Sequence, residues 1–204
     1  MTQFAFLRSV NLGKHNKVPM KELVAALEET GLGPVDYLLA SRNLVFREGV
    51  PGDLRDRVKE LILERFGVET DVILRDTEQL QALLDANPFG VPEAGSVQIS
   101  IWDGSADPEG LRQLLAADHS PDELHPADNA LIIRYAGSSH DSKLNNNLII
   151  RRLKVQSTLR NVRTFSRLLE KFGSGDAAER CVSKASHVLS CQTPALQGAA
   201  GCTC

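Results

Sequence analysis

The sequence predicts an α+β protein with two antiparallel sheets, and three observations lead to this class. Short apolar strands alternate with amphipathic helices in the order β-α-β-β-α-β over residues 4–75. A similar alternation begins again at residue 97, after the glycine- and proline-rich stretch 90–95. After residue 172 the apolar periodicity is lost. The β-α-β-β-α-β order is that of a ferredoxin-like (α/β-plait) unit, so the chain is expected to hold two such units and a disordered C-terminal tail.

The N-terminal unit is expected to span residues 1–88. Its predicted strands are apolar runs bounded by turn residues, at 4–10, 35–39, 44–47 and 71–75. The first helix follows Pro19, whose fixed φ suits a first helical position, and Gly31 ends it. The second helix starts near residue 52 and ends at Gly67. Each helix has a single apolar stripe, so both are expected to cover one face of the sheet and to leave the other face free for a partner.

The C-terminal unit is expected to span residues 95–172. Before it, Asp76 and Gln79 have the spacing of a capping box that starts a helix ending at 87–88. The expected elements of the unit are a strand at 97–102, a helix after Asp107, a hairpin of 123–125 and 130–135, a short helix within 142–153 and a final helix from Val162 to Phe172. A final strand equivalent to 71–75 is not evident in this unit.

The tail, residues 173–204, is rich in Ser, Ala, Gly, Cys and Thr and cannot bury enough apolar surface to offset its ordering entropy. All four cysteines lie in it: Cys181, Cys191, Cys202 and Cys204. A disulfide framework is therefore excluded for the main body. Their spacing matches none of the usual zinc patterns, so neither a metal site nor a cofactor is expected.

The chain has 204 residues, a net charge of -3 and 42% hydrophobic residues, which is ordinary for a soluble protein. It has no apolar run long enough to span a bilayer and no basic leader at its start, so a cytoplasmic protein without a membrane partner is expected.

Residues 68–140 carry 13 acidic and 3 basic side chains, whereas residues 141–172 carry 2 acidic and 8 basic ones. The two stretches are either two solvated faces that attract each other or a basic binding stripe beside an acidic one. The oligomeric state is not indicated.

Segment 10–19 joins the first strand to the first helix through a Gly/Asn/Lys turn. In such a turn, backbone N–H groups and the helix dipole favour an anion. The same segment carries a family resemblance. Residues 7–13 (L-R-S-V-N-L-G) resemble the motif L-R-G-I-N-V-G-G, residues 16–20 are similar to N-K-V-P-M, and residues 37–46 resemble Y-I-Q-S-G-N-V-V-F. Residues 158–164 are similar to T-x-R-N-W-x-T, and weaker matches fall at 87–89 and 143–144.

These motifs belong to the bacterial family DUF1697, a domain of unknown function, and the resemblance covers about residues 1–172. It implies two ferredoxin-like α+β units and no known reaction. Ser9 and Lys14 stand where the family has glycine, Arg42 replaces the glycine of S-G-N, and Val162 replaces the tryptophan of R-N-W. If the glycine at position 42 has a positive φ, arginine there costs about 1 kcal/mol.

Three polar clusters are the candidate ligand-binding residues. The first comprises Asn11, Lys14 and Lys17, the second Ser41, Arg42 and Asn43, and the third Thr158, Arg160, Asn161 and Thr164. If the clusters converge, they present amide, hydroxyl and cationic donors, which suit a phosphate or a carboxylate. The alternative is structural: the asparagines fix turns, the lysines are solvated, and Thr158 or Asn161 caps a helix.

The best functional hypothesis is a binding module for an anionic small molecule or a nucleotide. A second hypothesis is an enzyme of unrecognised type that uses the same cleft, with His15 or Ser41 moving a proton. A third is a nucleic-acid-interacting protein that uses the basic segment 151–167, although the chain lacks an aromatic pattern for stacking bases. Neither a P-loop nor a G-x-G-x-x-G motif nor a G-x-S-x-G elbow occurs.

Overall fold

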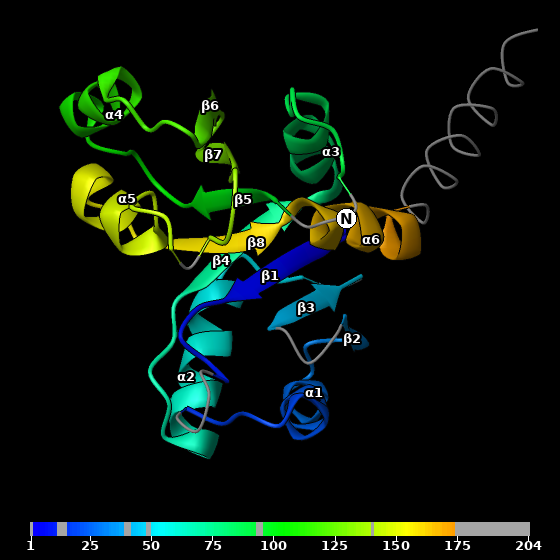
Figure 1. The fold of residues 1–204 in the computed structure, drawn as a ribbon. Coiled ribbons are helices and arrows are strands. Elements are labelled where there is room, and N and C mark those ends of the chain that lie inside the picture. Colours follow the sequence, from blue (N-terminus) through cyan, green and yellow to red (C-terminus); the bar gives the residue numbers. More distant parts are fainter. Residues whose placement is uncertain are drawn as a thin grey trace, which may run out of the picture.

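Helices and strands follow one another in the same order twice along the chain (Figure 1). The computed structural model describes residues 2–11, 16–38, 42–47, 50–92, 96–139 and 141–173. The N-terminal half contains β1 (Gln3–Leu7), α1 (Met20–Glu29), β2 (Val35–Tyr37), β3 (Asn43–Phe46), α2 (Leu54–Phe66), β4 (Val72–Asp76) and α3 (Thr77–Asp85). The C-terminal half contains β5 (Val97–Trp102), α4 (Pro108–Ala116), β6 (Glu123–Ala127), β7 (Ala130–Arg134), α5 (Asn146–Leu153), β8 (Ser157–Asn161) and α6 (Val162–Phe172).

Each half builds its own four-stranded sheet. The strand orders are β2-β3-β1-β4 and β6-β7-β5-β8, and every neighbouring pair is antiparallel. The two orders become identical when β1 is matched with β5 and β4 with β8. Over the described residues, the chain is therefore a mixed α+β protein with two antiparallel sheets and six helices.

The first sheet packs one face against α1 and α2, as the helix stripes predicted. Ala5 and Leu7 of β1 point to this face and are fully buried with Leu23, Leu27 and Ile62 from the two helices. Alternate residues of a strand point to opposite faces, so Phe4 and Phe6 point the other way. Gly67 ends α2 in the left-handed conformation, as its place after the apolar stripe indicated.

The opposite face of the first sheet is not free for a partner, and this sequence prediction is wrong. Phe4 and Phe6 are fully buried in a core shared with β5 and β7 of the second sheet and with α3 and α6. The ring of Phe6 stacks on Phe165 of α6 at 5.3 Å between centroids. Since apolar side chains occupy both faces of β1, both faces are stable only when covered. The C-terminal half supplies the cover.

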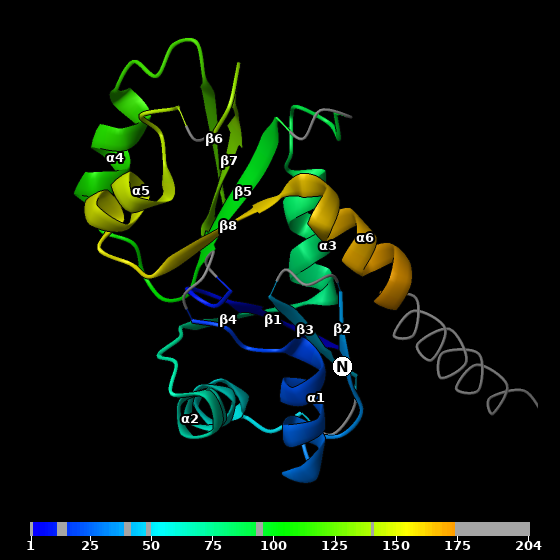
Figure 2. The same ribbon diagram turned by 60° about the horizontal axis from the view of Figure 1, so that its bottom comes forward.

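The helices α3 and α6 contact each other where the two sheets meet (Figure 2). Each follows the last strand of its half without an intervening loop, and each begins at a side-chain cap. Asp76 and Gln79 form the predicted capping box of α3, and the Asn161 side chain accepts from the Arg163 N–H at the start of α6. The cores of the two halves are thereby joined through equivalent helices.

The strand β8 was missed by the sequence prediction because it is largely polar. Its Ser157 and Thr158 are buried, and a hydrogen-bond network satisfies the polar groups. Asn146 donates to the Ser157 carbonyl at 2.9 Å and accepts from the Ser157 hydroxyl at 2.8 Å. The outer face of the second sheet is covered by α4 and α5.

The predicted disordered tail and its four cysteines fall beyond Gly173, outside the described residues. Among the residues that the structure describes, no helix is long and apolar enough to cross a membrane. The cytoplasmic location stays a prediction.

Candidate functional site

Arg75 and Arg160 occupy the same position in the two sheets. Arg75 of β4 is paired with Phe4, and Arg160 of β8 is paired with Ile99 at the same place in the other ladder. Each arginine stands one residue before the cap of the following helix. Both side chains are buried, with 5% and 8% of the residue surface exposed. A buried guanidinium has to find acceptors inside the protein, and both arginines find them across the boundary between the halves.

Each arginine donates to the last residue of the first strand in the other half. Arg160 Nη2 lies 2.6 Å from the Leu7 carbonyl oxygen, and Arg75 Nη2 lies 2.5 Å from the Trp102 carbonyl oxygen. Each Nη1 also donates to the carbonyl of the preceding residue in its own strand. Two guanidinium groups in equivalent positions thus join the halves, because each donates a hydrogen bond to the other half.

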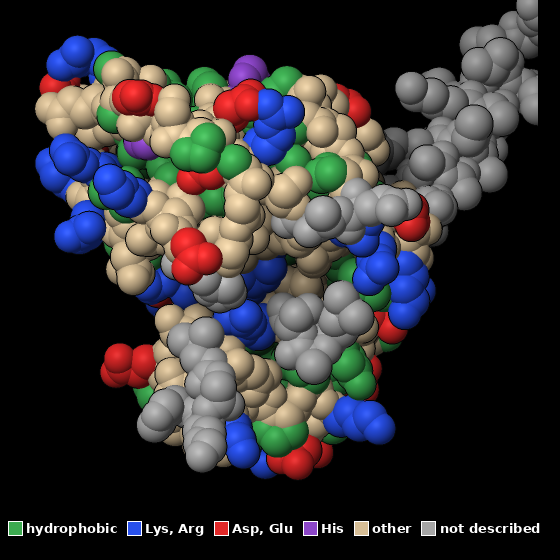
Figure 3. Space-filling view, viewed as in Figure 1, with side chains coloured by type: hydrophobic (Ala, Val, Ile, Leu, Met, Phe, Trp, Pro, Cys, Tyr) green, Lys and Arg blue, Asp and Glu red, His purple; other side chains and the backbone are tan. Residues whose placement is uncertain are grey.

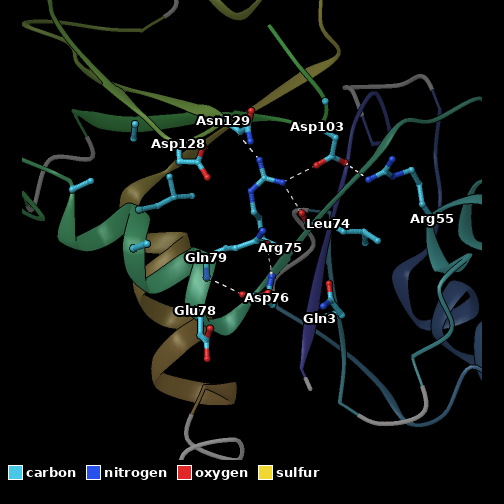
Figure 4. Close-up of a pocket in the computed structure, with 15 residues that line it drawn as sticks. Gln3, Arg55, Leu74, Arg75, Asp76, Glu78, Gln79, Asp103, Asp128 and Asn129 are labelled. Atoms are coloured by element: carbon cyan, nitrogen blue, oxygen red, sulfur yellow. Dashed lines mark hydrogen bonds and ion pairs between the residues drawn. The ribbon is translucent and has the colours of Figure 1, made fainter.

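The charge of Arg75 is paired with a carboxylate. Arg75 Nη1 lies 2.7 Å from Asp103 Oδ1, and Arg55 Nη2 lies 2.6 Å from Asp103 Oδ2, so one carboxylate serves two arginines. Figure 4 shows Asp103 between the two guanidinium groups. These residues line a cavity of about 790 Å³ between the halves, with Leu74 and Asp128 also on its wall.

Arg160 has no such carboxylate among the described residues. Its further acceptors are Asn43 Oδ1 at 3.2 Å from Nε and Thr158 Oγ1 at 2.5 Å from Nη1, and both are uncharged. Burial, and then repulsion by Arg42, lowers the pKa of Arg160 to about 9. The guanidinium therefore remains protonated at neutral pH, as a buried charge whose partners among the described residues are all neutral.

Asn43, which accepts a hydrogen bond from Arg160, has an amide nitrogen that lacks a partner in the described part of the chain. It is completely buried, and its Nδ2 has no hydrogen-bond acceptor among the described residues. The residue before it, Arg42, has a φ of 74°, and Ser9 has a φ of 61°. Both stand where the family pattern has glycine, so the backbone conformation that favours glycine is retained at both positions.

The structure brings together parts of two predicted clusters. Arg42 and Asn43 at the start of β3 adjoin Thr158 and Arg160 of β8, which are more than a hundred residues away along the chain. Asn161 caps α6, as the structural alternative stated. Ser41 lies outside the described residues.

Among the described residues of the first cluster, neither Asn11 nor Lys17 makes a hydrogen bond with Arg160 or Asn43. The Asn11 side chain fixes a turn, since it donates to the Val18 carbonyl and accepts from the Val18 N–H. Lys17 is exposed. Lys14 and His15 lie outside the described residues.

Sequence reasoning missed Arg75, Asp103 and Arg55. A signal for Arg75 was present, because it directly precedes the cap of α3 just as Arg160 precedes the cap of α6. Asp103 carries no local pattern, since its partners come from β4 and α2. The basic segment 151–167 is not one continuous face: Arg151 and Arg152 are exposed on α5, whereas Arg160 is buried.

Lys and Arg side chains gather in the hollow where the two halves meet (Figure 3). The cations described near this boundary include Arg8, which is bound by Asp71 at 3.0 Å and by Gln156. Among the described residues, His, Cys, Asp and Glu form no group that could hold a metal ion. The chemistry on offer at the Arg160 site is thus the binding of negative charge by guanidinium and amide donors.

Comparison with known proteins identifies the family and the fold. No curated protein matches the chain. A solved structure, "The structure of conserved bacterial protein SP0830 from Streptococcus pneumoniae", is similar with a TM-score of 0.61 and 18% sequence identity, covering 82% of this chain and 96% of that one. The likeness shows a shared fold. The family model described as "Protein of unknown function (DUF1697)" matches residues 1–131, and the chain therefore belongs to the DUF1697 family.

Proposed function

We propose that the protein binds an anionic small molecule or a nucleotide at the boundary between its halves, beside Arg160. The observation that carries this proposal is the buried Arg160 guanidinium, whose described acceptors are all uncharged. A buried charge without a counter-charge is costly, and an anion that reaches it removes much of that cost. Arg42 and the unpaired amide of Asn43 supply further donors.

The other candidate residues are proposed either to contact the ligand or to hold the contacting residues in position. Thr158 orients the guanidinium of Arg160 through its hydroxyl, and Asn161 fixes the start of α6 beside it. Lys14, Lys17 and Ser41 are proposed as contacts supplied by the loops after β1 and β2. Asn11 shapes the first of these loops by its bonds to Val18.

The test is a thermal-shift titration of the full chain with inorganic phosphate, succinate and adenosine monophosphate at constant ionic strength. A ligand that binds only the folded state raises the Tm by mass action, by the equivalent of about 2.7 kcal/mol at a hundred times its Kd. The shift is expected to disappear in Arg42→Ala. It is expected to persist in Arg47→Ala, which removes an exposed arginine at the far end of the same strand.

A Tm that responds to none of the three anions more than to sodium chloride would contradict the proposal. So would a shift that Arg42→Ala and Arg47→Ala reduce equally, since that result indicates general surface charge.

We further infer that the halves are two ferredoxin-like units, at residues 1–88 and 95–172. The support is the repeated β-α-β-β-α-β order with matching strand orders in the two sheets. The shared core between the sheets predicts that the units unfold together. Two separate unfolding transitions in urea, seen by circular dichroism and by fluorescence of Trp102, would show instead that each unit is independently stable.

A further inference from the structure

The two halves repeat not only their strands but the surroundings of one arginine. In each half the arginine donates Nη1 to the preceding carbonyl and Nη2 across the boundary to the end of the other half's first strand. Leu7 and Trp102 are equivalent, because each is paired with the first residue of the last strand. The residue that follows each of them is therefore equivalent too: Arg8 in one half and Asp103 in the other.

This equivalent position has opposite charge in the two halves. Asp103 turns to Arg75 and is shared with Arg55. Arg8 is itself a cation, and it donates to Asp71 and to Gln156. The Arg160 site consequently has the backbone frame of the Arg75 site without its carboxylate.

The Arg75 site shows which anion this frame accepts. A carboxylate there gives one oxygen to each of two guanidinium groups, at 2.7 and 2.6 Å. Arg42 lies next to Arg160 in the fold, because the Leu7 N–H donates to the Arg42 carbonyl at 2.9 Å and the Leu7 carbonyl accepts from Arg160 at 2.6 Å. The charge of Arg42 also contributes to the lowered pKa of Arg160. The Asn43 amide nitrogen, fully buried and without a described acceptor, is an additional donor for an incoming oxygen. Donors in this arrangement suit a planar monoanion with two oxygens.

We propose that the ligand of the Arg160 site is a carboxylate, whose oxygens are shared by Arg42 and Arg160 as those of Asp103 are shared by Arg55 and Arg75. This inference rests on the proposed function and adds the chemical class of the ligand. A carboxylate matches a pair of guanidinium groups in planarity and charge. It supplies beside Arg160 the negative charge that the repeat supplies beside Arg75 with its own side chain. Thr158 Oγ1 and the Leu159 carbonyl accept both hydrogens of Arg160 Nη1, so the carboxylate is expected to bind at Nη2.

The first experiment compares succinate with inorganic phosphate on the full chain at pH 7 and equal ionic strength. At about a hundred times its Kd, succinate is expected to raise the Tm by roughly 5–10 °C, and phosphate by much less. A phosphate shift equal to or larger than the succinate shift overturns the carboxylate assignment and leaves anion binding intact. If neither anion, nor adenosine monophosphate, shifts the Tm, both the assignment and the proposed function fail.

The second experiment supplies the carboxylate from the chain itself. Arg8→Asp and Arg8→Asn are compared in an Asp71→Asn background, because Asp71 would repel an aspartate at position 8. Both variants lose the Arg8 ion pair, and they differ only in the carboxylate. Arg8→Asp is expected to have a Tm several degrees above that of Arg8→Asn and to lose its response to succinate.

An Arg8→Asp chain that is no more stable than the Arg8→Asn chain shows that a carboxylate does not fit beside Arg160, and the assignment is then wrong. A succinate response of the same size in the Arg8→Asp and Arg8→Asn variants would also show that the carboxylate assignment is wrong. Neither outcome depends on knowing the natural ligand.

Discussion

Arg75 and Arg160 occupy equivalent positions in two sheets of the same strand order, yet within the described part of the chain only Arg75 meets a carboxylate. Both guanidinium groups are buried and donate to the other half's first strand. At Arg75, the Asp103 carboxylate forms one ion pair with Arg75 and another with Arg55. At Arg160 the described acceptors are neutral. The two halves thus share the hydrogen bonds of a buried arginine, whereas a carboxylate partner is found among the described residues in only one of them.

The largest expected difference is between Arg75→Met and Arg160→Met. Arg75→Met leaves Asp103 with only Arg55 and the Trp102 carbonyl without its donor, and is expected to cost about 3 kcal/mol of unfolding free energy. Arg160→Met also frees a carbonyl, that of Leu7, but removes an uncompensated charge, so the expected cost is about 1–2 kcal/mol. Urea unfolding measures both. Equal costs would mean that Arg160 has a counter-charge after all.

Asp103→Asn makes the Arg75 site resemble the Arg160 site. The change removes a charged acceptor from Arg55 and Arg75 and is expected to cost about 2 kcal/mol of unfolding free energy. It is also expected to create a new stabilisation by succinate in the thermal-shift titration. Asp128→Asn is the matched control, because Asp128 lies exposed on the wall of the same cavity. A response to succinate that is the same in both variants would show that the Arg75 and Arg160 sites are not chemically equivalent.

Arg42→Gly tests the other side of the comparison. Glycine relieves the positive φ of 74° and removes the repulsion of Arg160, so the unfolding free energy is expected to rise by about 1 kcal/mol. Arg42→Ala removes the same charge and keeps the strain, and is expected to gain less. Both variants should lose the response to anions. A destabilised Arg42→Gly chain would show that Arg42 contributes to the fold more than the strain costs.

The sequence indicated most of the fold because strand alternation and helix stripes are local signals. The capping box at Asp76 and the stop at Gly67 need only a few neighbouring residues, and both are found. The strand β8 was missed because Ser157 and Thr158 are buried through side-chain hydrogen bonds with Asn146 and Arg160, and hydrophobic periodicity registers neither such bonds nor contacts between remote parts of the chain. The same reason explains the assumed free face of the first sheet, whose cover comes from the other half.

The candidate site was predictable only in part. Arg42, Asn43 and Arg160 were singled out by family resemblance and by donor chemistry, and the structure brings them together. Arg75 and Asp103 were not singled out, because their relation to Arg160 is visible only in the register of two separate ladders. The Arg75 site thus shows which charged partner is not found beside Arg160 among the described residues.

The smallest expected difference is between the helix caps that follow the two arginines. Asp76→Ala and Asn161→Ala each remove a cap and are expected to cost about 1 kcal/mol of unfolding free energy. Asp76 should cost more by about 0.3–1 kcal/mol, because its negative charge also interacts with the helix dipole. Since salt screens that interaction, the difference should shrink when urea unfolding is repeated at high salt. A difference that persists at high salt would contradict the dipole explanation. The Gln79 half of the capping box cannot account for it, because Asp76→Ala keeps the backbone N–H that donates to Gln79 Oε1.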